Sequence, residues 1–419
     1  MRQRGLAAIV ALVLMGAAPV AQADQGSPVE GLPPTEVPDV AQPQIDDPIS
    51  EAELEDLKFL ASQEGMSLKA AIDRYGWNDN FALAVATIRE ASPEAFTGAE
   101  IVDGEGAWVA FAAGAPDKAV EIIEAFEKAH AAVAVEVRPD FGFTEVELEK
   151  AIEAVHYAVF DAANVRDATT SFDFDTRQIT TVVALEGGVA DAALAELRAG
   201  ATDRLVDAGL GGLLDIIAVK VVQSNLPALG GTDDNNAHIG GEGITTCTTG
   251  FVVKNAAGVR GVSTAGHCQN AQSDDGVALA FQAGHEGAQG DFQWHTGPQG
   301  EPDDFYSGDG ITTEVFRRDV AGVGAPAVNQ SLCKNGRNGF KDCGTVMKLN
   351  VCHFELCNLV QMDARRATGG DSGGPVFWGN TAYGLHQGWR YDPIWPFDRD
   401  LFSRADRIDN ALGVNVANS

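Results

Sequence analysis

The sequence has few long apolar stretches: after residue 23, no segment offers about 18 uninterrupted apolar residues, so we expect no membrane anchor. The first 23 residues are different. Arg2 and Arg4 precede an apolar run over 6–18, and a small-x-small triplet follows at 21–23. This pattern is typical of a secretory signal peptide, residues 1–23, whose apolar run is too short to cross a bilayer. We therefore expect a secreted, extracellular protein; the alternative is a buried N-terminal helix.

Cysteine is also missing from more than half of the chain. All six cysteines lie after residue 240, and they are Cys247, Cys268, Cys333, Cys343, Cys352 and Cys357. An even number of cysteines in an exported chain indicates disulfides. Their confinement to the C-terminal part indicates that the two halves of the chain are stabilised differently.

Basic residues are scarce in the N-terminal half. Residues 24–236 carry 40 acidic and 13 basic side chains, a net charge of −27, whereas residues 237–419 carry 20 and 14, a net charge of −6. A protein binds the phosphate backbone of a nucleic acid through a basic surface, so the acidity of residues 24–236 argues against nucleic-acid binding by this half of the chain. The acidity indicates either a solvated surface or a segment that pairs electrostatically with a partner on the same chain.

The N-terminal half divides into a leader and an α+β domain. Residues 24–50 are rich in Pro, Asp and Gln and predict a flexible leader. Residues 51–225 alternate between helical and β patterns without a nucleophile motif. Ser50 with Glu53, and Thr144 with Glu147, predict two capping boxes. We expect helices over 50–74, 80–91, 117–129, 144–159 and 191–208, strands over 107–113, 133–137 and 216–222, and a hairpin over 171–185.

The composition changes after residue 225. Residues 226–242 are rich in Gly, Asn and Asp, which predicts a linker, and we place an activation linker at 226–238 because such segments are easily cut. Residues 239–419 contain many short β-like runs between turns, which is typical of a barrel or a sandwich. An amphipathic stretch over 401–412 predicts a C-terminal helix.

The string Gly370-Asp371-Ser372-Gly373-Gly374-Pro375 carries the strongest indication of chemistry. Glycines around a serine permit a tight turn that presents the hydroxyl and frees backbone N–H groups to face an oxyanion. The N–H groups of Gly370 and Ser372 are the expected donors. Asp371 is then a buried anion that needs a cationic partner. The alternative is an ordinary turn.

A second string, Thr264-Ala265-Gly266-His267-Cys268, lies about 100 residues earlier. A serine hydroxyl is a weak nucleophile and needs a base of near-neutral pKa, which a histidine such as His267 supplies. Cys268 beside that base would fix the loop through a disulfide to Cys247. A lone histidine after a strand is usually structural, and the downstream serine motif reverses that expectation.

These two strings resemble those of chymotrypsin-like serine proteases, most closely the compact bacterial branch of streptogrisins and α-lytic protease. The resemblance covers residues 239–416 and includes Cys333 and Cys343, which look like the short disulfide loop of that branch. It implies a double antiparallel β-barrel with the active site in the cleft between the barrels. It also implies that residues 51–225 are a pro-domain, a removable folding partner and inhibitor.

The resemblance further implies a catalytic triad. Ser372 would attack the acyl carbon, His267 would take and return the proton, and an aspartate at the start of a strand would orient the imidazole. Asp291, in Gly290-Asp291-Phe292, fits this position best. The other aspartates considered are Asp274, Asp275, Asp303 and Asp304.

One feature departs from the family pattern, and a second matches the bacterial branch in particular. The loop before the serine, residues 365–369, has no cysteine, whereas Cys352 and Cys357 are close enough to form a small loop of their own. The bacterial branch places a basic side chain just after the first cysteine of the hairpin, and Lys334 has that position. We therefore predict an ion pair between Lys334 and Asp371; the alternative is a solvated loop lysine.

The segment from Tyr383 to Gly388 should line the primary specificity pocket. Relatives that prefer glutamate look similar here, with a histidine at the position of His386, and an imidazole can bind a carboxylate. We assign His386, Gln387 and Gly388 to the pocket and Arg366 to the facing loop, which gives a hypothesis of acidic P1 preference. The alternative is a histidine packed behind the pocket.

The sequence therefore predicts a secreted serine endopeptidase made as a pro-enzyme, acting on proteins or peptides as a monomer. Nothing in it indicates a metal, a cofactor, or a nucleic-acid or membrane partner. The alternative is a catalytically silent protease-like binding module with an acidic N-terminal interaction domain.

Overall fold

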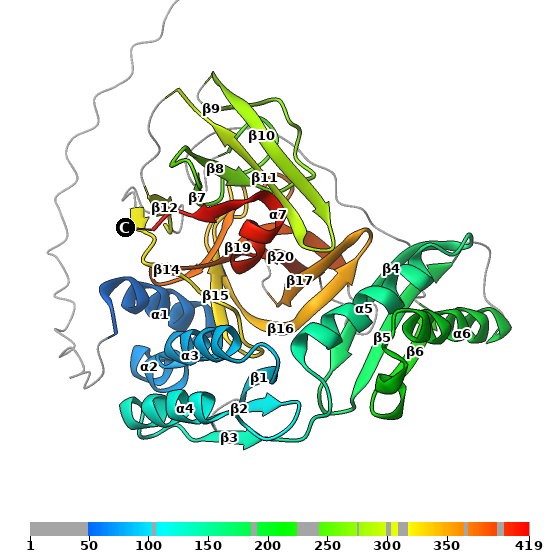
Figure 1. The fold of residues 1–419 in the computed structure, drawn as a ribbon. Helices are drawn as coiled ribbons and strands as arrows, with labels where there is room; N and C mark the ends of the chain where they lie inside the picture. The colour runs from blue at the N-terminus through cyan, green and yellow to red at the C-terminus, as the bar shows by residue number, and fades with distance from the viewer. Residues whose placement is uncertain are drawn as a thin grey trace, which may run out of the picture. The chain divides into compact units, whose positions relative to one another are not determined.

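The computed structural model describes residues 49–102, 106–185, 191–223, 243–274, 276–298, 303–308, 317–363, 368–391 and 398–418 (Figure 1). These residues belong to one compact unit, Ile45–Ser419. The predicted signal peptide 1–23, nearly all of the leader 24–50, and the activation linker 226–238 lie outside the described residues. We call residues 49–223 the N-terminal region and residues 243–418 the C-terminal region.

The N-terminal region is an α+β structure. Its elements are α1 (Glu51–Glu64), α2 (Leu68–Tyr75), α3 (Asn78–Ala91), β1 (Phe96–Val102), β2 (Gly106–Phe111), α4 (Asp117–Ala129), β3 (Val135–Arg138), α5 (Glu145–Phe160), β4 (Val165–Asp173), β5 (Gln178–Leu185), α6 (Asp191–Asp207), the 3₁₀ turn η1 (Gly211–Asp215) and β6 (Ala218–Gln223). Strands β1–β3 form one sheet. Strands β4, β5 and β6 belong to a second sheet, which extends into the C-terminal region. Helices α3 and α4 share a core with the first sheet, and α5 and α6 with the second.

Two expectations about this region need correction. The single helix predicted over 50–74 is two helices, because Gly65 adopts the left-handed conformation (φ 68°) and ends α1. Strand β1 has no counterpart among the elements expected from the sequence. Both predicted capping boxes, Ser50 with Glu53 and Thr144 with Glu147, are present.

The C-terminal region consists mainly of strands. They are β7 (Val252–Asn255), β8 (Arg260–Thr264), β9 (Gln272–Asp274), β10 (Val277–Gly287), β11 (Gly290–Thr296), β12 (Asp304–Tyr306), β13 (Arg317–Asp319), β14 (Gly322–Val323), β15 (Ser331–Lys334), β16 (Asp342–His353), β17 (Leu356–Met362), β18 (Pro375–Trp378), β19 (Thr381–Tyr391), β20 (Asp398–Arg404) and β21 (Val414–Val416), with η2 (Ala405–Arg407) and the helix α7 (Ile408–Leu412) before β21. The predicted helix over 401–412 is wrong in its first half, because that segment is strand β20, paired with β17 and β19.

Strands β12 and β13 pair in a small sheet of their own, and the other strands belong to two larger sheets. The first runs β21-β7-β8-β11-β10-β9 and is antiparallel throughout. The second contains a closed ring, because β15 pairs with both β18 and β16 at the ends of the series β15-β18-β19-β20-β17-β16. Chain segments of both sheets contribute to the main core of the C-terminal region.

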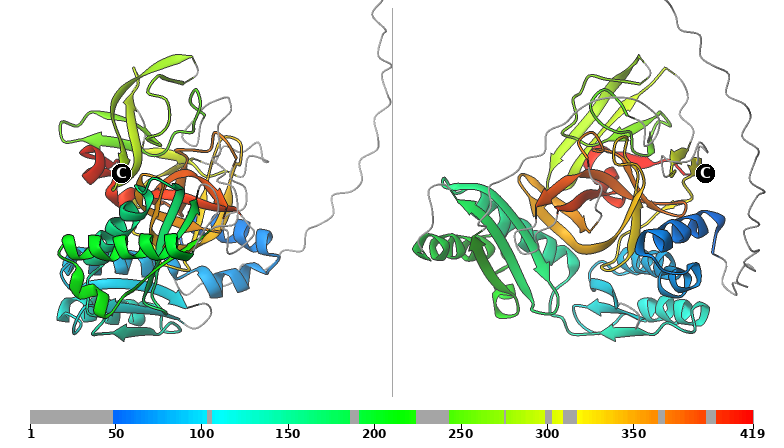
Figure 2. Two further views of the ribbon diagram at one scale, coloured as in Figure 1. Left: turned by 90° about the vertical axis from the view of Figure 1, so that its right-hand side faces the viewer. Right: turned by 180° about the vertical axis from the view of Figure 1, so that it is seen from behind.

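The ring continues into the N-terminal region. Cys352 and His353 of β16 pair with Thr170 and Thr169 of β4, so that β4, β5 and β6 extend the sheet (Figure 2). Side chains support this junction, since the His156 imidazole on α5 lies 2.5 Å from the Phe354 carbonyl oxygen. The N-terminal region thus adds strands to the C-terminal one by direct backbone pairing.

Candidate active site

His267, Asp291 and Ser372 come from three segments of the C-terminal region. His267 follows β8, and Asp291 is the second residue of β11, the strand that pairs with β8. Ser372 lies in the loop between β17 and β18. The first two residues therefore belong to one sheet, and the serine precedes a strand of the other.

Asp291 holds the imidazole of His267. Its Oδ2 lies 2.5 Å from His267 Nδ1, and its Oδ1 accepts the backbone N–H of His267 at 2.9 Å. Asp291 is completely buried, whereas 37% of the His267 side chain is exposed. The carboxylate thus fixes both the ring and the backbone of His267, and leaves the imidazole open to the surface.

Local packing explains how these two residues come so close. A Cβ on Gly266 would lie 2.6 Å from the His285 carbonyl oxygen and 2.7 Å from Asp291 Oδ1, so only glycine fits before the histidine. The Asp291 N–H donates to Ser403 Oγ at 2.9 Å. Glu286 lies opposite Asp291 in the strand pair, and partial burial together with the Asp291 charge raises the pKa of Glu286.

The serine loop packs against the histidine loop through Gly373. This glycine has φ +89°, and a Cβ there would lie 2.0 Å from Thr264 Oγ1 and 2.8 Å from the Ala265 nitrogen. The Thr248 N–H donates to the Ser372 carbonyl oxygen at 2.8 Å, and the Thr248 carbonyl oxygen accepts the Thr264 hydroxyl at 2.7 Å. Thr248 thereby joins the two loops. Sequence reasoning missed it, since an isolated threonine gives no signal.

The Ser372 hydroxyl donates to the Gln387 carbonyl oxygen at 3.2 Å. Gly370 has φ +92°, a conformation that favours glycine, and its carbonyl oxygen accepts the Thr248 hydroxyl at 2.6 Å. Among the described residues, no acceptor pairs with the N–H of Gly370 or Ser372. These are the two groups expected to face an oxyanion.

Asp371 is buried and surrounded by donors. Its carboxylate accepts the N–H groups of Asn338, Gly339 and Thr368, each at 2.9 Å. The Lys334 ammonium is also buried, with Nζ 3.6 Å from Asp371 Oδ2. It lies 3.4 Å from Asp400 Oδ2 as well, so one lysine serves two carboxylates.

Strand β19 brings the residues expected to line a pocket beside the serine. The Gly373 N–H donates to the His386 carbonyl oxygen at 2.6 Å, and the space beside Gly388 is open. The His386 side chain is only 2% exposed, with Nε2 3.6 Å from Asp400 Oδ2. Sequence reasoning missed Asp400, which lies in no predicted element and in no motif. Arg366 lies outside the described residues.

The other aspartates considered have different surroundings. Asp303 forms an ion pair with Arg260, and Asp304 lies 3.5 Å from Arg317. Asp274 ends strand β9, and Asp275 lies outside the described residues. Asp291 is the aspartate that the structure brings to His267.

The structure joins Cys247 to Cys268, Cys333 to Cys343, and Cys352 to Cys357. The first disulfide lies next to the histidine. The described part of the chain contains one close group of potential metal ligands, which consists of Cys247, His267 and Cys268. The two cysteines form a disulfide, and disulfide sulfurs are poor metal ligands because they are not thiolates. The described residues include no helix both long and apolar enough to cross a bilayer.

The structure thus sets a histidine against a buried carboxylate, and it places a serine in a glycine turn whose loop packs against the histidine loop. No protein-family model matches the sequence, and no curated protein matches it. Solved structures that are similar to the C-terminal part are bacterial chymotrypsin-like serine proteases.

Three of these structures illustrate the likeness. Thermobifida fusca protease A is 22% identical, and the match covers 44% of this chain and 100% of that chain, with a TM-score of 0.37. A Nocardiopsis protease is 20% identical, with 43% and 98% covered and a TM-score of 0.37. A glutamic acid-specific serine protease, described as using a histidine triad in substrate binding, is 24% identical, with 42% and 99% covered and a TM-score of 0.37. Because these identities and TM-scores are low, the likeness by itself supports no conclusion about activity.

Proposed function

We propose that the chain is the precursor of a secreted serine endopeptidase and that residues 239–419 are the enzyme. The contact of His267 Nδ1 with the buried Asp291 carboxylate carries this proposal. A carboxylate in that place keeps a proton on Nδ1 and leaves Nε2 unprotonated, which is the tautomer a general base requires. The packing of Gly373 against Thr264 and Ala265 supports the proposal, because these two residues lead into the loop that carries His267.

The proposed reaction is acyl transfer to Ser372 and then to water. Ser372 Oγ attacks the peptide carbonyl while His267 Nε2 takes its proton and gives it to the leaving amine. The N–H groups of Gly370 and Ser372 stabilise the negative charge that develops on the carbonyl oxygen. Ser372 must first give up its hydrogen bond to the Gln387 carbonyl oxygen. Water then cleaves the acyl-enzyme with the same histidine as base.

A fluorophosphonate probe tests this proposal, because it labels only a serine activated by a base. We expect the processed wild-type protein to be labelled and the Ser372→Ala and His267→Ala variants to be unlabelled. Ser273→Ala is the matched control, since Ser273 lies on β9 in the same region and should leave labelling intact. An unlabelled wild type would favour the catalytically silent binding module instead.

The proposed role of residues 51–225 is that of a pro-domain. Antiparallel barrels depend on non-local pairing and fold slowly, so a partner attached to the same chain can lower the folding barrier and later be removed. Its strand pairing with β16 supports this role. Expression of residues 237–419 alone tests it, because ready folding and cleavage without the N-terminal region would contradict a folding function.

The proposal also includes a preference for acidic P1 residues, supported by the place of His386 on the strand that contacts the serine loop. Its near-complete burial beside Asp400 favours the alternative, a histidine packed behind the pocket. Chromogenic peptides that end in Glu or Phe distinguish the two, since equal cleavage would rule out the preference. Replacing His386 by Phe should reduce cleavage after Glu only if the imidazole contributes to the pocket.

A further inference from the structure

Helix α1 buries charged residues against the C-terminal region. Leu57 and Leu60 of this helix belong to the same core cluster as Phe377 and Trp378 of strand β18. A Cβ on Gly379, in the turn between β18 and β19, would lie 2.7 Å from Glu53 Cγ. The helix is therefore packed directly on the hairpin that follows the serine loop.

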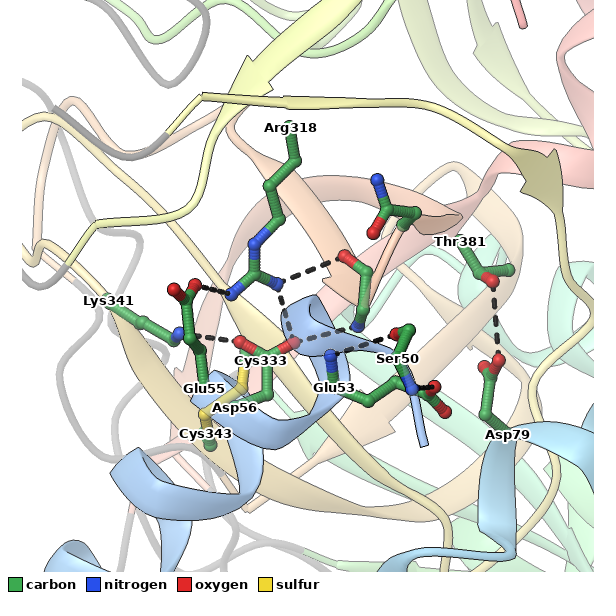
Figure 3. Close-up of polar contacts among 12 residues, drawn as sticks. Ser50, Glu53, Glu55, Asp56, Asp79, Arg318, Cys333, Lys341, Cys343 and Thr381 are labelled. Atoms are coloured by element: carbon green, nitrogen blue, oxygen red, sulfur yellow. Dashed lines mark hydrogen bonds and ion pairs between the residues drawn. A yellow bond between two sulfur atoms is a disulfide. The ribbon is translucent and has the colours of Figure 1, made fainter. Parts of the chain in front are cut away.

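Asp56 is the centre of this contact (Figure 3). Its Oδ2 accepts Arg318 Nη1 at 2.8 Å and the Gly379 N–H at 2.7 Å, and its Oδ1 accepts Lys341 Nζ at 2.6 Å. The neighbouring Glu55 accepts Arg318 Nη2 at 3.0 Å. Asp56 is fully buried, and its ion-pair partners among the described residues, Arg318 and Lys341, belong to the C-terminal region.

The two cations depend on this helix in return. The Arg318 and Lys341 side chains are 5% and 4% exposed. In the part of the chain that the structure describes, every ion pair of Arg318 and Lys341 goes to Glu55 or Asp56. Removing the Asp56 carboxylate while the helix stays in place would leave two buried cations without that anion, and an uncompensated buried charge is strongly unfavourable.

We propose that Arg318, Lys341 and the Gly379 N–H form a carboxylate-binding site of the C-terminal region, and that its ligand is Asp56 of helix α1. Occupation of the site holds the N-terminal helices, residues 49–91, on the β18–β19 hairpin. The site would also accept a small free carboxylate once Asp56 is absent. This inference rests on the proposed function only in expecting that the N-terminal region is later removed.

The test uses the full chain with Ser372→Ala, which prevents self-cleavage, and measures amide hydrogen exchange by mass spectrometry. Asp56→Ala should speed exchange in residues 51–64 and 375–382 by about 100-fold, because removing one partner of a buried ion pair leaves the other charges uncompensated. Asp73→Ala is the matched control. Asp73 lies on α2 of the same helical segment, its side chain is 61% exposed, and its ion-pair partner among the described residues is Lys69, so its removal should change little.

Formate then tests for a binding site rather than a general structural role. About 0.1 M formate should restore much of the protection in Asp56→Ala by mass action, whereas chloride at equal ionic strength should not. The rescue should disappear when Arg318→Met and Lys341→Met are added. Formate that acts no better than chloride would overturn the proposal, as would equal effects of Asp56→Ala and Asp73→Ala.

A variant that unfolds entirely is recognised by fast exchange in residues 290–296, which lie away from this contact. In that case Asp56→Ala combined with Arg318→Met and Lys341→Met decides the question, since removing the cations with the anion should recover folding and protection. Failure to recover would overturn the proposal. Because all these measurements use Ser372→Ala, they are independent of whether the protein hydrolyses peptides, which the fluorophosphonate probe decides.

Discussion

Asp79 should make the attachment of helix α3 to strand β19 depend on pH. The Tyr383 hydroxyl donates to Asp79 Oδ1 at 2.5 Å, and the Thr381 hydroxyl donates to Oδ2 at 3.3 Å. Burial is the main cause that raises the pKa of Asp79 from 3.8 to about 7, and the charges of Glu53 and Asp56 add to it. The hydrogen bonds from Tyr383 and Thr381 act in the opposite direction.

The sign follows from the direction of the pKa shift. When α3 is docked, Asp79 keeps its proton up to about pH 7, whereas the exposed group loses it near 3.8. The docked state therefore binds more protons between these values, and docking weakens as the pH rises. A difference of about three pKa units amounts to at most about 4 kcal/mol, of which about 2–3 kcal/mol falls between about pH 5 and about pH 8.

Hydrogen exchange of residues 78–91 in the full chain with Ser372→Ala measures this effect. After correction for the intrinsic pH dependence of exchange, the opening constant should rise roughly 100-fold between about pH 5 and about pH 8. Asp79→Asn should remove most of this slope, because an amide does not titrate and its one oxygen can still accept the Tyr383 hydroxyl. Asp73→Asn is the control. The reasoning fails if Asp79→Asn keeps the wild-type slope.

Three further predictions concern other sites. Burial lowers the pKa of His156 from 6.5 to about 4, and the hydrogen bond to the Phe354 carbonyl acts in the opposite direction. The free energy of unfolding measured with urea should therefore fall by up to about 3 kcal/mol as the pH drops through this range. His156→Gln should flatten this dependence of stability on pH. Asp291→Asn in the processed protein should lower kcat/KM about 10⁴-fold, the loss typical of a triad without its aspartate, with an unchanged near-UV circular dichroism spectrum. Gly373→Ala should abolish fluorophosphonate labelling and lower the free energy of unfolding by about 2 kcal/mol or more, because the methyl group would meet Thr264 Oγ1 at 2.0 Å. Gly322→Ala, with open space beside it, is the control measured by the same two assays.

Local signals predicted much of the fold. The Ser50–Glu53 and Thr144–Glu147 pairs are local, and both form capping boxes at the starts of helices. The segment over 401–412 misled, because an amphipathic pattern over a few residues fits either a helix or a strand. Its first half is strand β20, which forms because β17 and β19 offer edges on both sides. Those partners are distant in sequence.

The candidate site shows the same contrast between residues that local motifs predict and residues whose partners are distant in sequence. His267, Asp291 and Ser372 stand in short motifs, and the structure brings His267 to Asp291. Lys334 was expected to pair with Asp371, and it does lie 3.6 Å away, but it also faces Asp400. No motif contains Asp400 or Asp56, since each becomes a partner only after the sheets and helices have packed. Such residues are visible only in three dimensions.

The acidity of residues 24–236 is more than a solvated surface. Asp56 and Glu55 hold Arg318 and Lys341 at one contact, and Glu149 of α5 contacts Arg404 and Arg407 at another. Backbone pairing of β4 with β16 makes a third contact. Buried ion pairs contribute little net stability, because desolvation offsets most of their attraction, but removing one partner is costly. Glu55, Asp56 and Glu149 therefore act chiefly by tying buried cations of the C-terminal region to the N-terminal region, and Arg404 pairs with Asp406 of its own region as well. Salt should weaken these two ionic contacts far less than it weakens exposed pairs such as Lys69 with Asp73.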